Sequence, residues 1–500
     1  MFEPIREVVI VGGGTAGWMT AAALSKVLPA PTRIRLVESD EIGTIGVGEA
    51  SIPNLRNFNA ALEIDEDEFL RQTRGTLKLG IQFVDWAAPG DSYIHGFGGI
   101  GPELALVRFH QYWLKMYLEG AAPDIARYQI NTAAPDSCKA MRARPEMRGS
   151  PLGDLVHAFH FDAGLYARFL RSHAEGRGVQ RIEGRIVQVE QREPDGFVSA
   201  VVLDGGRRVE GELFVDCSGL RGILIEQTLH AGYDDWSHWL PCDAAVAVPC
   251  ESVAPLVPYT RSIARPAGWQ WRIPLQHRIG NGLVYCSSLQ SADEATAQLV
   301  ASLDGAALAE PRHIRFVAGR RRRSWVRNVV AVGLASGFLE PLESTSIHLI
   351  QQAVNRLIGL FPHRGFDEAD IREFNEQTRF EIERIRDFII LHYKATQRTD
   401  APLWRQTAAM PIPDTLQHKM DLYRSSGRVL RHANELFAES SWLQVMHGQR
   451  LRPRSYDPLV DARSREDIAG LLRDVEDVVA RCLDSMPTHE EFIAAHCAAR

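Results

Sequence analysis

The 500-residue sequence lacks the marks of a membrane-bound, secreted or nucleic-acid-binding protein. Acidic residues outnumber basic ones, 63 to 56, and the net charge of -7 argues against a surface that neutralises phosphates. No apolar run approaches the roughly 18 residues that a membrane-spanning helix requires, and we find no secretion signal. We therefore expect a cytoplasmic protein that binds neither nucleic acid nor membranes.

Cysteine is scarce as well. The seven cysteines are odd in number, scattered along the chain, and form no Cys-x-x-Cys pair. Such scatter is typical of reduced thiols in a cytosolic protein. The sequence predicts neither a disulfide framework nor a metal site.

Near the N-terminus the sequence does carry a strong signal. A short apolar run at residues 8–11 predicts a buried strand, and GGGTAG follows it at the start of an alanine-rich helix. Gly12, Gly14 and Gly17 form the pattern G-x-G-x-x-G, and a second predicted strand ends at Glu38. This order of strand, glycine turn, helix, strand and acid predicts a dinucleotide site.

Each residue of the motif has a physical reason. Gly12 permits a tight turn, Gly14 lets the backbone approach a pyrophosphate, and Gly17 lets the helix pack close to the sheet. The start of the helix, with Thr15 and Ala16, favours an anion. The acid Glu38 can accept a hydrogen bond from a ribose hydroxyl. The motif alone does not separate FAD from NAD.

A second glycine-rich stretch, GFGGIG at residues 96–101, lacks this context. No buried strand precedes it, and no strand with an acid follows at the right distance. We interpret it as a mobile loop. The chain is therefore expected to bind one dinucleotide and to have no separate nicotinamide domain.

Further motifs select the cofactor. FVDCSG, in which a predicted strand ends at Asp216, resembles the second FAD signature of flavin monooxygenases. GVGEASIP at residues 46–53 resembles the strap that crosses the flavin in one subgroup of them. With GGGTAGWM, WQWRIP at 269–274 and EPLESTSIHL at 340–349, the set resembles the flavin-dependent halogenases of the tryptophan-halogenase type. The resemblance covers most of residues 5–360.

The resemblance implies FAD, supplied in the reduced form. It adds the following residues to the cofactor site: Gly48, Glu49, Ala50, Asp216, Gly333 and Leu334. The expected fold class is α/β, with an FAD-binding Rossmann-like core of the flavin monooxygenase type, an antiparallel sheet and a C-terminal helical region. We expect residues 1–365 to form the FAD-binding region, with an inserted substrate-side sheet at about 240–320, and residues 366–500 to be helical. The pattern also predicts helices at residues 155–175 and 413–436 and a disordered loop at 131–153.

The resemblance also implies the reaction. Reduced FAD from a separate flavin reductase, together with dioxygen, oxidises a bound halide (bromide or chloride) to hypohalous acid. This acid halogenates a small indole-like or other electron-rich aromatic substrate. Relatives are often dimers, so a homodimer is one expectation.

Two residues match the positions that direct halogenation in the family. Lys78, in GTLKLGIQFVDW, has an ordinary interpretation as a solvated lysine, but its neighbours are apolar. A partly desolvated ammonium can hydrogen-bond hypohalous acid or become a haloamine, and the sequence leaves both open. Glu343 is also explicable as an acid near a helix start. As a carboxylate near the reacting ring, it can stabilise a cationic intermediate and help to remove its proton.

The halide is expected at the start of the helix that follows Glu343. The backbone amides of Thr345 and Ser346 form a ready anion site there. Many relatives have glycine at the position of Ser346, so the preference for bromide or chloride stays open.

WQWRIP places two tryptophans on one face of a predicted strand. In the family this pair keeps organic substrate away from the flavin, and we assign Trp269 and Trp271 to that shield; a structural aromatic pair in the core is the alternative. His95, Phe97 and Trp442 are the candidate substrate contacts. The C-terminal stretch around Trp442 has no adjacent tyrosines, so we do not expect free tryptophan to be the preferred substrate.

Two other functions fit part of the pattern. A flavin-dependent aromatic hydroxylase shares the FAD motifs but does not need Lys78, Glu343 or the tryptophan pair. A catalytically idle FAD-binding partner protein would not need to retain Lys78 and Glu343. Both residues are present, so the sequence favours a halogenase.

Overall fold

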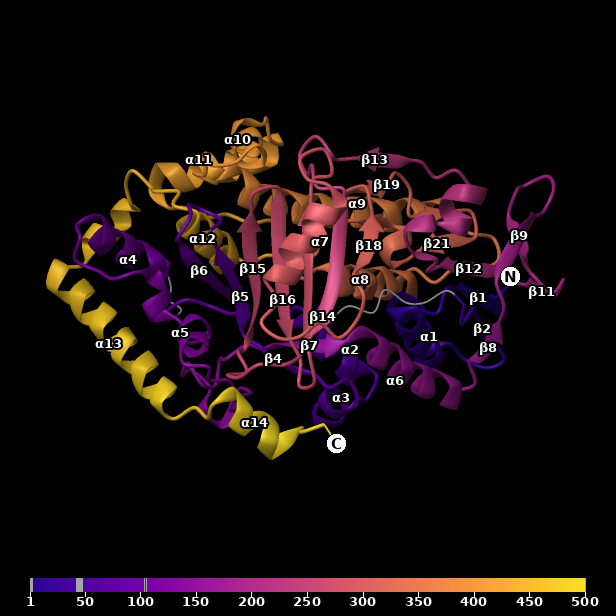
Figure 1. Ribbon diagram of the computed structural model, residues 1–500, viewed down its shortest axis with the longest axis horizontal. Coiled ribbons are helices and arrows are strands. Elements are labelled where there is room, and N and C mark those ends of the chain that lie inside the picture. The colour runs from indigo at the N-terminus through magenta and orange to yellow at the C-terminus, as the bar shows by residue number, and fades with distance from the viewer. Residues whose placement is uncertain (1–2, 42–47, 103, 105, 500) are drawn as a thin grey trace. The chain divides into compact units, whose positions relative to one another are not determined.

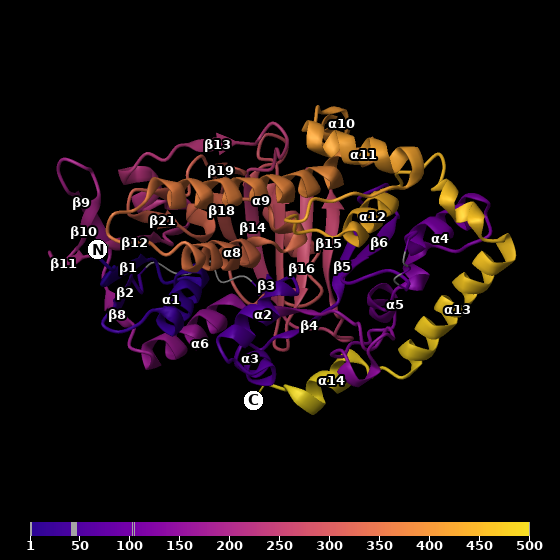
Figure 2. The ribbon, with the colours of Figure 1, turned by 180° about the vertical axis from the view of Figure 1, so that it is seen from behind.

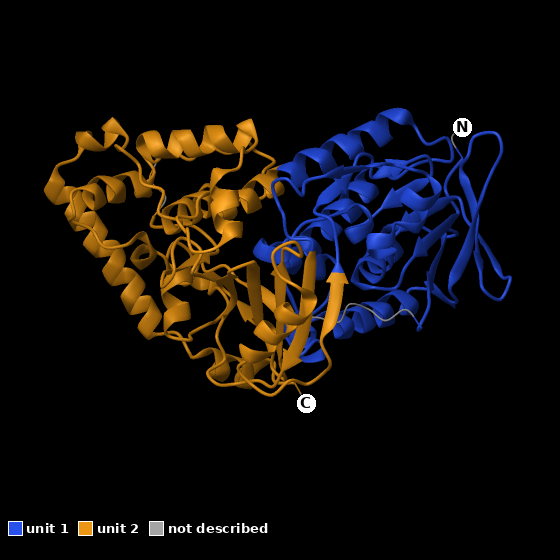
Figure 3. Ribbon diagram, turned by 45° about the horizontal axis from the view of Figure 1, so that its top comes forward, with its two compact units in different colours: residues 1–75, 161–243, 315–383 blue, residues 76–160, 244–314, 384–500 orange. Residues whose placement is uncertain are grey.

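The computed structural model describes residues 3–41, 48–102, 104 and 106–499, and Figures 1 and 2 label most of its elements. The chain forms two compact units, coloured separately in Figure 3. Unit 1 comprises residues 1–75, 161–243 and 315–383, and unit 2 comprises residues 76–160, 244–314 and 384–500. Each unit is thus built from three separate stretches of chain. The expected linear boundary at residue 365 stays a prediction.

Unit 1 contains a parallel sheet with helices, two small three-stranded sheets and several short turns of helix. Its elements are β1 (Glu7–Val11), α1 (Thr15–Val27), β2 (Arg33–Glu38), β3 (Gly48–Ala50), α2 (Asn54–Ala61), α3 (Glu66–Gln72), α6 (Ala163–Gly176), β8 (Gln180–Glu183), β9 (Ile186–Gln191), β10 (Val198–Leu203), β11 (Arg208–Glu210), β12 (Leu213–Asp216), β13 (Tyr233–Asp235), β19 (Gly319–Arg321), β20 (Trp325–Val326), β21 (Val329–Ala331), β22 (Gly337–Phe338) and α8 (Ser346–Gly359).

The main sheet of unit 1 has the strand order β20-β21-β12-β1-β2-β8. All its pairings are parallel except that of β20 with β21. Because β1, β2, β12 and β21 run in one direction, their carboxyl ends meet at one edge of the sheet. Ligands of such sheets bind at that edge. The predicted α/β class with a Rossmann-like core is confirmed.

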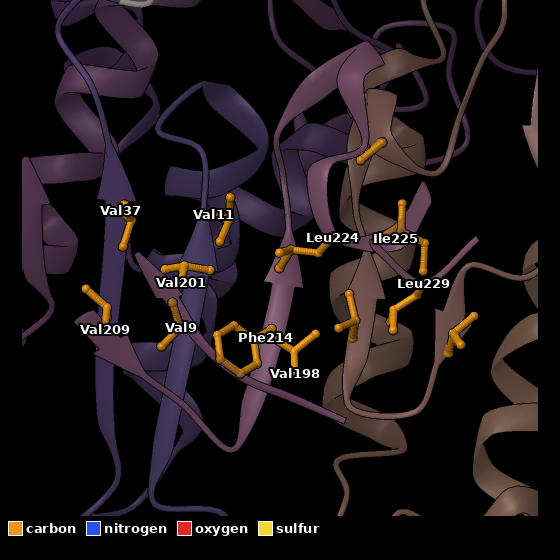
Figure 4. Packing of buried hydrophobic residues seen from close by; sticks show 14 of the residues in the cluster. Val9, Val11, Val37, Val198, Val201, Val209, Phe214, Leu224, Ile225 and Leu229 are labelled. Carbon is orange, nitrogen blue, oxygen red and sulfur yellow. The ribbon is translucent and has the colours of Figure 1, made fainter. Parts of the chain in front are cut away.

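Residues of β1 alternate between the two faces of this sheet. Val9 and Val11 point into a buried cluster with Val201 of the small β9–β10–β11 sheet and Leu224 of a short π-helix, as Figure 4 shows. On the strand's other side, Val8 and Ile10 are equally buried. Helix α1 packs against both α6 and α8. Burial on both faces explains why the sequence shows a continuous apolar run here.

Unit 2 is built on a seven-stranded sheet with the order β18-β14-β17-β16-β15-β5-β6. Its pairings among β14, β17, β16 and β15 and between β5 and β6 are antiparallel, as expected, but β15 and β5 are parallel. The elements of this unit are β4 (Thr76–Lys78), β5 (Gly80–Val84), β6 (Ser92–Gly96), α4 (Phe109–Leu118), α5 (Ile130–Asp136), β14 (Ala244–Cys250), β15 (Tyr259–Arg265), β16 (Gly268–Pro274), β17 (Ile279–Tyr285), α7 (Ala292–Ala301), α10 (Pro402–Ala409), α11 (Asp414–Ser426), α12 (Glu439–Gly448), α13 (Arg465–Asp484) and α14 (His489–His496).

Three elements contain residues of both units: β7 (Ala158–Asp162), β18 (Arg312–Arg315) and α9 (Glu368–Lys394). Helix α7 covers one face of the seven-stranded sheet, where Ala295 and Leu299 pack against Val246, Leu283 and Tyr285. Beyond residue 366 the described chain is mostly helical. No helix in the described part of the chain is long and apolar enough to cross a membrane.

Three local expectations were wrong. The pattern at residues 155–175 predicts one helix, but its first part is strand β7, and Asp162 begins α6 by accepting a hydrogen bond from the Leu165 amide (3.0 Å). The helix expected at 413–436 ends at Ser426, where Gly427 takes a left-handed conformation. The loop expected to be disordered, 131–153, contains most of α5; there Asn131 donates to the carbonyl of Leu79 (3.2 Å).

Candidate active site

The glycine loop lies at the carboxyl edge of the unit 1 sheet, directly after β1. Gly12 has φ +108°, a left-handed value, and the Gly12 amide donates to Val37 of the neighbouring strand (2.8 Å). A Cβ on Gly17 would overlap the Gly12 carbonyl, whereas one on Gly14 would meet no atom within 4 Å. Gly14 is also the N-cap of α1 and no side chain caps the helix. The loop therefore has no space for a side chain at Gly17 but has free space at Gly14.

Glu38 ends β2 beside this loop. A Cβ on Gly13 would overlap the Glu38 carboxylate, so the acid lies directly against the glycine turn. Arg181 of the next strand donates to Glu38 Oε1 (2.5 Å), and Arg171 lies 3.8 Å from the same oxygen. These arginines hold the carboxylate at the place where a dinucleotide fold holds its ribose.

Asp216 ends β12, the other neighbour of β1. Its Oδ1 accepts from the Ser218 amide (3.0 Å), and its Oδ2 accepts from the amides of Leu224 and Ile225 (2.8 Å each). The carboxylate is fully buried. Its observed contacts therefore organise the turn and the π-helix that follow β12, a structural role that the sequence did not reveal.

The turn after β21 joins the same edge. Gly333 has φ +70°, and a Cβ there would lie 2.9 Å from the Cβ of Ala16 at the start of α1. This turn, Gly333–Ala335, includes Leu334. The structure thus brings the predicted residues of the glycine loop, Glu38, the Asp216 turn and the Gly333 turn to one edge of one sheet.

The predicted strap is only partly described, because residues 46 and 47 lie outside the described residues. The next three residues, Gly48, Glu49 and Ala50, form β3. Burial raises the pKa of the Glu49 carboxyl to about 7.

These unit 1 residues fit FAD. The loop has no space for a side chain at Gly12 or Gly17, but a Cβ at Gly14 would meet no protein atom. A pyrophosphate would lie at Gly14, against the uncapped start of α1. Glu38 stands beside that loop with its charge already balanced by Arg181. Among the described residues, no group of three or more His, Cys, Asp or Glu side chains could hold a metal ion.

Glu343 lies in a short 3₁₀ turn, Pro341–Glu343, and is almost fully buried. Ser344 follows in a left-handed conformation (φ +58°), and this reverses the chain into α8. Thr345 is the N-cap of α8, yet its side chain makes no capping hydrogen bond. The first amides of α8, including that of Ser346, therefore have no side-chain cap, as an anion site at a helix start requires.

Helix α8 is held in place by a group that the sequence pattern did not reveal. His348, two residues after Ser346, shares a hydrogen bond with Glu381 of α9 through Nε2 (2.8 Å). Arg356, two turns later, donates to the other Glu381 oxygen (2.5 Å). Long-range ion pairs of this kind leave no periodic signal in the sequence.

Lys78 lies in β4 of unit 2 and its side chain is 0% exposed. Its Nζ is 5.4 Å from the centroid of the Phe97 ring, so the structure brings two of the predicted site residues together. β4 pairs with β7, with Lys78 opposite Ala158. The Phe97 amide donates to Leu79 (2.9 Å), which fixes the ring next to the lysine strand. The interpretation of Lys78 as a solvated lysine is wrong.

Trp269 and Trp271 lie on one face of β16, as the sequence predicts, with ring centroids 6.1 Å apart. Trp269 is 0% and Trp271 7% exposed. Directly opposite Trp271 in the neighbouring strands are Ser262 and Gly282, and opposite Trp269 are Ala264 and Val284. Small residues therefore flank Trp271 on both sides and Trp269 on one side. Trp269 also contacts Trp86 (6.4 Å between centroids).

The predicted substrate residues His95 and Trp442 are both buried against a third aromatic residue, Phe388. The ring centroids of His95 and Phe388 are 5.7 Å apart, and those of Phe388 and Trp442 are 4.8 Å apart. Gln444 connects the two segments, because its side chain accepts from the Gly96 amide (2.9 Å) and donates to the Gly96 carbonyl (3.0 Å). The sequence did not reveal Phe388 or Gln444.

The comparisons with known proteins agree with this architecture. The family model for tryptophan halogenase matches residues 7–465. The chain belongs to the tryptophan halogenase family. Among solved structures, it is similar to a flavin-dependent halogenase from Xanthomonas campestris (49% identity, TM-score 0.96) and to BrvH, a flavin-dependent halogenase from Brevundimonas sp. BAL3 (47% identity, TM-score 0.94). Each similarity covers 99% of both chains.

Curated sequences give the same family. Tryptophan 7-halogenase RebH from Lentzea aerocolonigenes is 33% identical over 535 residues, which cover 99% of each chain. The predicted family, the flavin dependence and the enzyme class of halogenase are confirmed. The assignments of individual residues stay predictions.

Proposed function

We propose that this tryptophan-halogenase-family member uses reduced FAD and dioxygen to oxidise bromide or chloride, and that Lys78 and Glu343 direct the resulting hypohalous acid onto an indole-like or other electron-rich aromatic. The observation that carries the proposal is the full burial of Lys78, whose ammonium lies 5.4 Å from the centroid of the Phe97 ring. A lysine is rarely buried without a compensating role.

The cofactor site is assigned to unit 1. When bound in its reduced form, FAD would activate dioxygen, and dioxygen supplies the oxidising equivalents that turn halide into hypohalous acid. Gly12, Gly14 and Gly17 let the backbone approach the pyrophosphate, and Glu38 accepts from the ribose. Glu49 and the Gly333 turn are assigned to the flavin end. Asp216 supports this site from behind, through the three amides that it fixes.

The halide is assigned to the start of α8. The uncapped amides of Thr345 and Ser346 donate to an anion, and the dipole of this 14-residue helix adds to the attraction. The His348–Glu381 contact holds this helix in place. The side chain of Ser346 narrows the space beside the halide compared with a glycine.

Lys78 receives the hypohalous acid. Its ammonium holds the oxygen by a hydrogen bond, or its deprotonated amine takes the halogen from hypohalous acid to give a haloamine and water. Phe97 shapes the space beside Nζ. Glu343, a buried carboxylate, stabilises the cationic ring and accepts the proton that the halogen replaces. Trp269 and Trp271 are assigned to shielding the flavin from organic substrate.

A neutral aromatic suits the substrate region better than free tryptophan. Around Trp442, Glu435 is already paired with Lys419 (3.0 Å) and Glu439 with Arg108 (3.2 Å). Either glutamate could bind an α-ammonium group only if its existing ion pair were broken. A buried zwitterion without partners loses about 1–3 kcal/mol for each unsatisfied polar group. Indole has neither the ammonium nor the carboxylate and avoids that cost. We also propose a separate flavin reductase as partner, a cytoplasmic location and a homodimer.

The test is product mass. The protein is incubated with FAD, a flavin reductase, NADH, bromide and indole in air. A bromine isotope pair on the indole supports the proposal, whereas an added oxygen atom would indicate an aromatic hydroxylase and would overturn it. Absence of any product while the reductase turns over would indicate a protein that binds flavin without catalysing halogenation of indole.

A further inference from the structure

Two buried histidines contact the strand of Lys78. His160 of β7 lies opposite Thr76 in register, two residues before the lysine. His489, the first residue of α14, contacts Leu77. Both histidine side chains are 0% exposed. All these residues belong to unit 2.

The hydrogen bonds around His160 determine which of its ring nitrogens carries the proton. The Thr76 hydroxyl donates to the carbonyl of Pro274 (2.8 Å), which can only accept. Its single proton is therefore used, and the Nδ1 of His160, 3.0 Å away, must donate to Thr76 Oγ1. In a neutral ring Nε2 then accepts from the hydroxyl of Thr260 (2.9 Å).

His160 is kept neutral by its surroundings. Burial lowers its pKa well below the usual value of 6.5, and the positive charges of Lys78 and Arg272 lower it further, as does His489. Asp304 of the loop after α7 forms an ion pair with Arg272. The ring therefore carries its one proton on Nδ1 at neutral pH.

This chain of bonds joins four strands, β7, β4, β16 and β15. Thr76 and Lys78 are two apart in β4 and point to the same face. Pro274 ends β16, the strand that carries Trp269 and Trp271, and Thr260 lies in β15. His160 thus ties the lysine strand to the end of the tryptophan strand.

His489 secures the other edge of β4, which is the terminal strand of its sheet. Its Nε2 accepts from the Leu77 amide (3.0 Å), and its Nδ1 lies 3.2 Å from the carbonyl of Leu256, to which it donates. Burial lowers its pKa to about 4, so Nε2 is available as an acceptor at neutral pH. The imidazole takes the place of a neighbouring strand beside Lys78.

We propose that His160 is a positioning residue for the halogen-transfer step: its neutral Nδ1–H form holds β4, and with it Lys78, in a fixed place relative to β16. His489 supports the same strand from its edge. The inference rests on the proposed role of Lys78. It concerns the position of the Lys78 ammonium. We assign His160 no contact with halide or substrate.

The first test is spectroscopic and needs no turnover. In protein labelled with ¹⁵N-histidine, long-range ¹H–¹⁵N correlations of the ring distinguish the two neutral forms from the charged one. We expect His160, assigned by its loss in His160→Asn, to have its proton on Nδ1 between pH 6 and pH 8. A proton on Nε2 alone, or a charged ring, would overturn the inference.

The second test measures how the halogen is divided between substrate and solution. Brominated indole is compared with hypobromous acid that escapes and is trapped by an added phenolic dye. His160→Leu should lower the ratio of bromoindole to trapped bromine on the order of tenfold or more, the scale of a displaced reacting group. His160→Asn, whose amide can still donate to Thr76, should recover most of it.

The Lys78→Ala variant serves as the background that distinguishes a loss of positioning from a general loss of folded structure. In that background His160→Leu should not change the ratio further, because the group that it positions is gone. Equal ratios for wild type and His160→Leu would contradict the positioning role. A wild-type ratio in Lys78→Ala alone would instead contradict the proposed function, so the two failures are distinguishable.

Discussion

Gly282 of β17 lies directly opposite Trp271 of β16, and it is a glycine because the indole occupies the space of its side chain. A Cβ at this position would lie 2.6 Å from Cε2 of the indole and closer still to two other ring carbons. The orientation of Trp271 therefore depends on the absence of a methyl group in the neighbouring strand. A substitution at Gly282 can therefore test the tryptophan pair without changing either tryptophan.

We expect Gly282→Ala to displace the Trp271 ring and to destabilise unit 2 by about 1–3 kcal/mol, the usual cost of overpacking. Thermal unfolding and tryptophan fluorescence report the two effects. If the pair shields the flavin, hydroxylated or peroxide by-products should rise relative to halogenated product. Gly359→Ala, where no atom lies within 4 Å of an added Cβ, is the matched control. Unchanged fluorescence and stability in Gly282→Ala would contradict the packing argument.

Gly14→Val should abolish FAD binding while leaving the protein folded. An added Cβ at Gly14 meets no protein atom within 4 Å, so a loss of flavin in a folded variant reports on the place of the pyrophosphate. Flavin occupancy is read from the visible absorbance of the purified protein, and folding from circular dichroism. Wild-type occupancy in this variant would show that the loop does not hold the cofactor.

Indole should be the better substrate than free tryptophan. The acids Glu435 and Glu439 already pair with Lys419 and Arg108, so a buried α-ammonium group would have to break an ion pair. We expect a higher kcat/KM for bromination of indole, measured with the same reductase and halide. A higher kcat/KM for tryptophan would mean that other residues bind the amino acid.

The contribution of Glu49 to the stability of the flavin-free protein should fall as the pH rises from about 4.5 to about 7. Burial raises the pKa of this carboxyl from 4.5 to about 7, so the folded protein holds the proton more tightly than the unfolded chain does. The contribution is fully present below pH 4.5 and is lost above 7. Glu49→Gln should therefore gain thermal stability over wild type at pH 8 but not at pH 4.5.

Glu63→Gln is the control for this pH effect. The Glu63 carboxyl is exposed, and a hydrogen bond from Lys26 lowers its pKa, so its removal should give no gain at pH 8. Equal melting temperatures of wild type and Glu49→Gln at pH 8 would contradict the burial of the Glu49 carboxyl in the folded state.

The sequence predicts the parts of this protein that depend on local order. The glycine loop, β1, β2 and α1 follow from the run of residues 8–38, because glycine spacing and apolar runs act within one supersecondary unit. The facing of Trp269 and Trp271 follows from the two-residue period of a strand. The start of α8 after Glu343 was also expected.

What the sequence could not predict depends on contacts between distant segments. Strands β5 and β6 join the sheet formed by residues 244–285, and the parallel pairing of β15 with β5 has no local signal. His489 accepts a hydrogen bond from the amide of Leu77, which lies 412 positions away in the sequence. Residues 155–175 have a pattern that fits a helix, and only the pairing with β4 selects the strand that carries His160.

The most direct test of the account removes the side-chain nitrogen of Lys78. Lys78→Met, of similar length and apolar, should fit among the buried neighbours and leave FAD binding intact. We expect bromoindole to fall below detection while hypobromous acid, trapped by a phenolic dye in solution, continues to form at a rate within about twofold of wild type, since one positioned group contributes about 10²–10⁴-fold only to the step it serves. Glu343→Gln should lower bromoindole formation on the order of 10²-fold in the same assay. Undiminished bromoindole from Lys78→Met would contradict the account, because the buried ammonium would then have no part in the transfer.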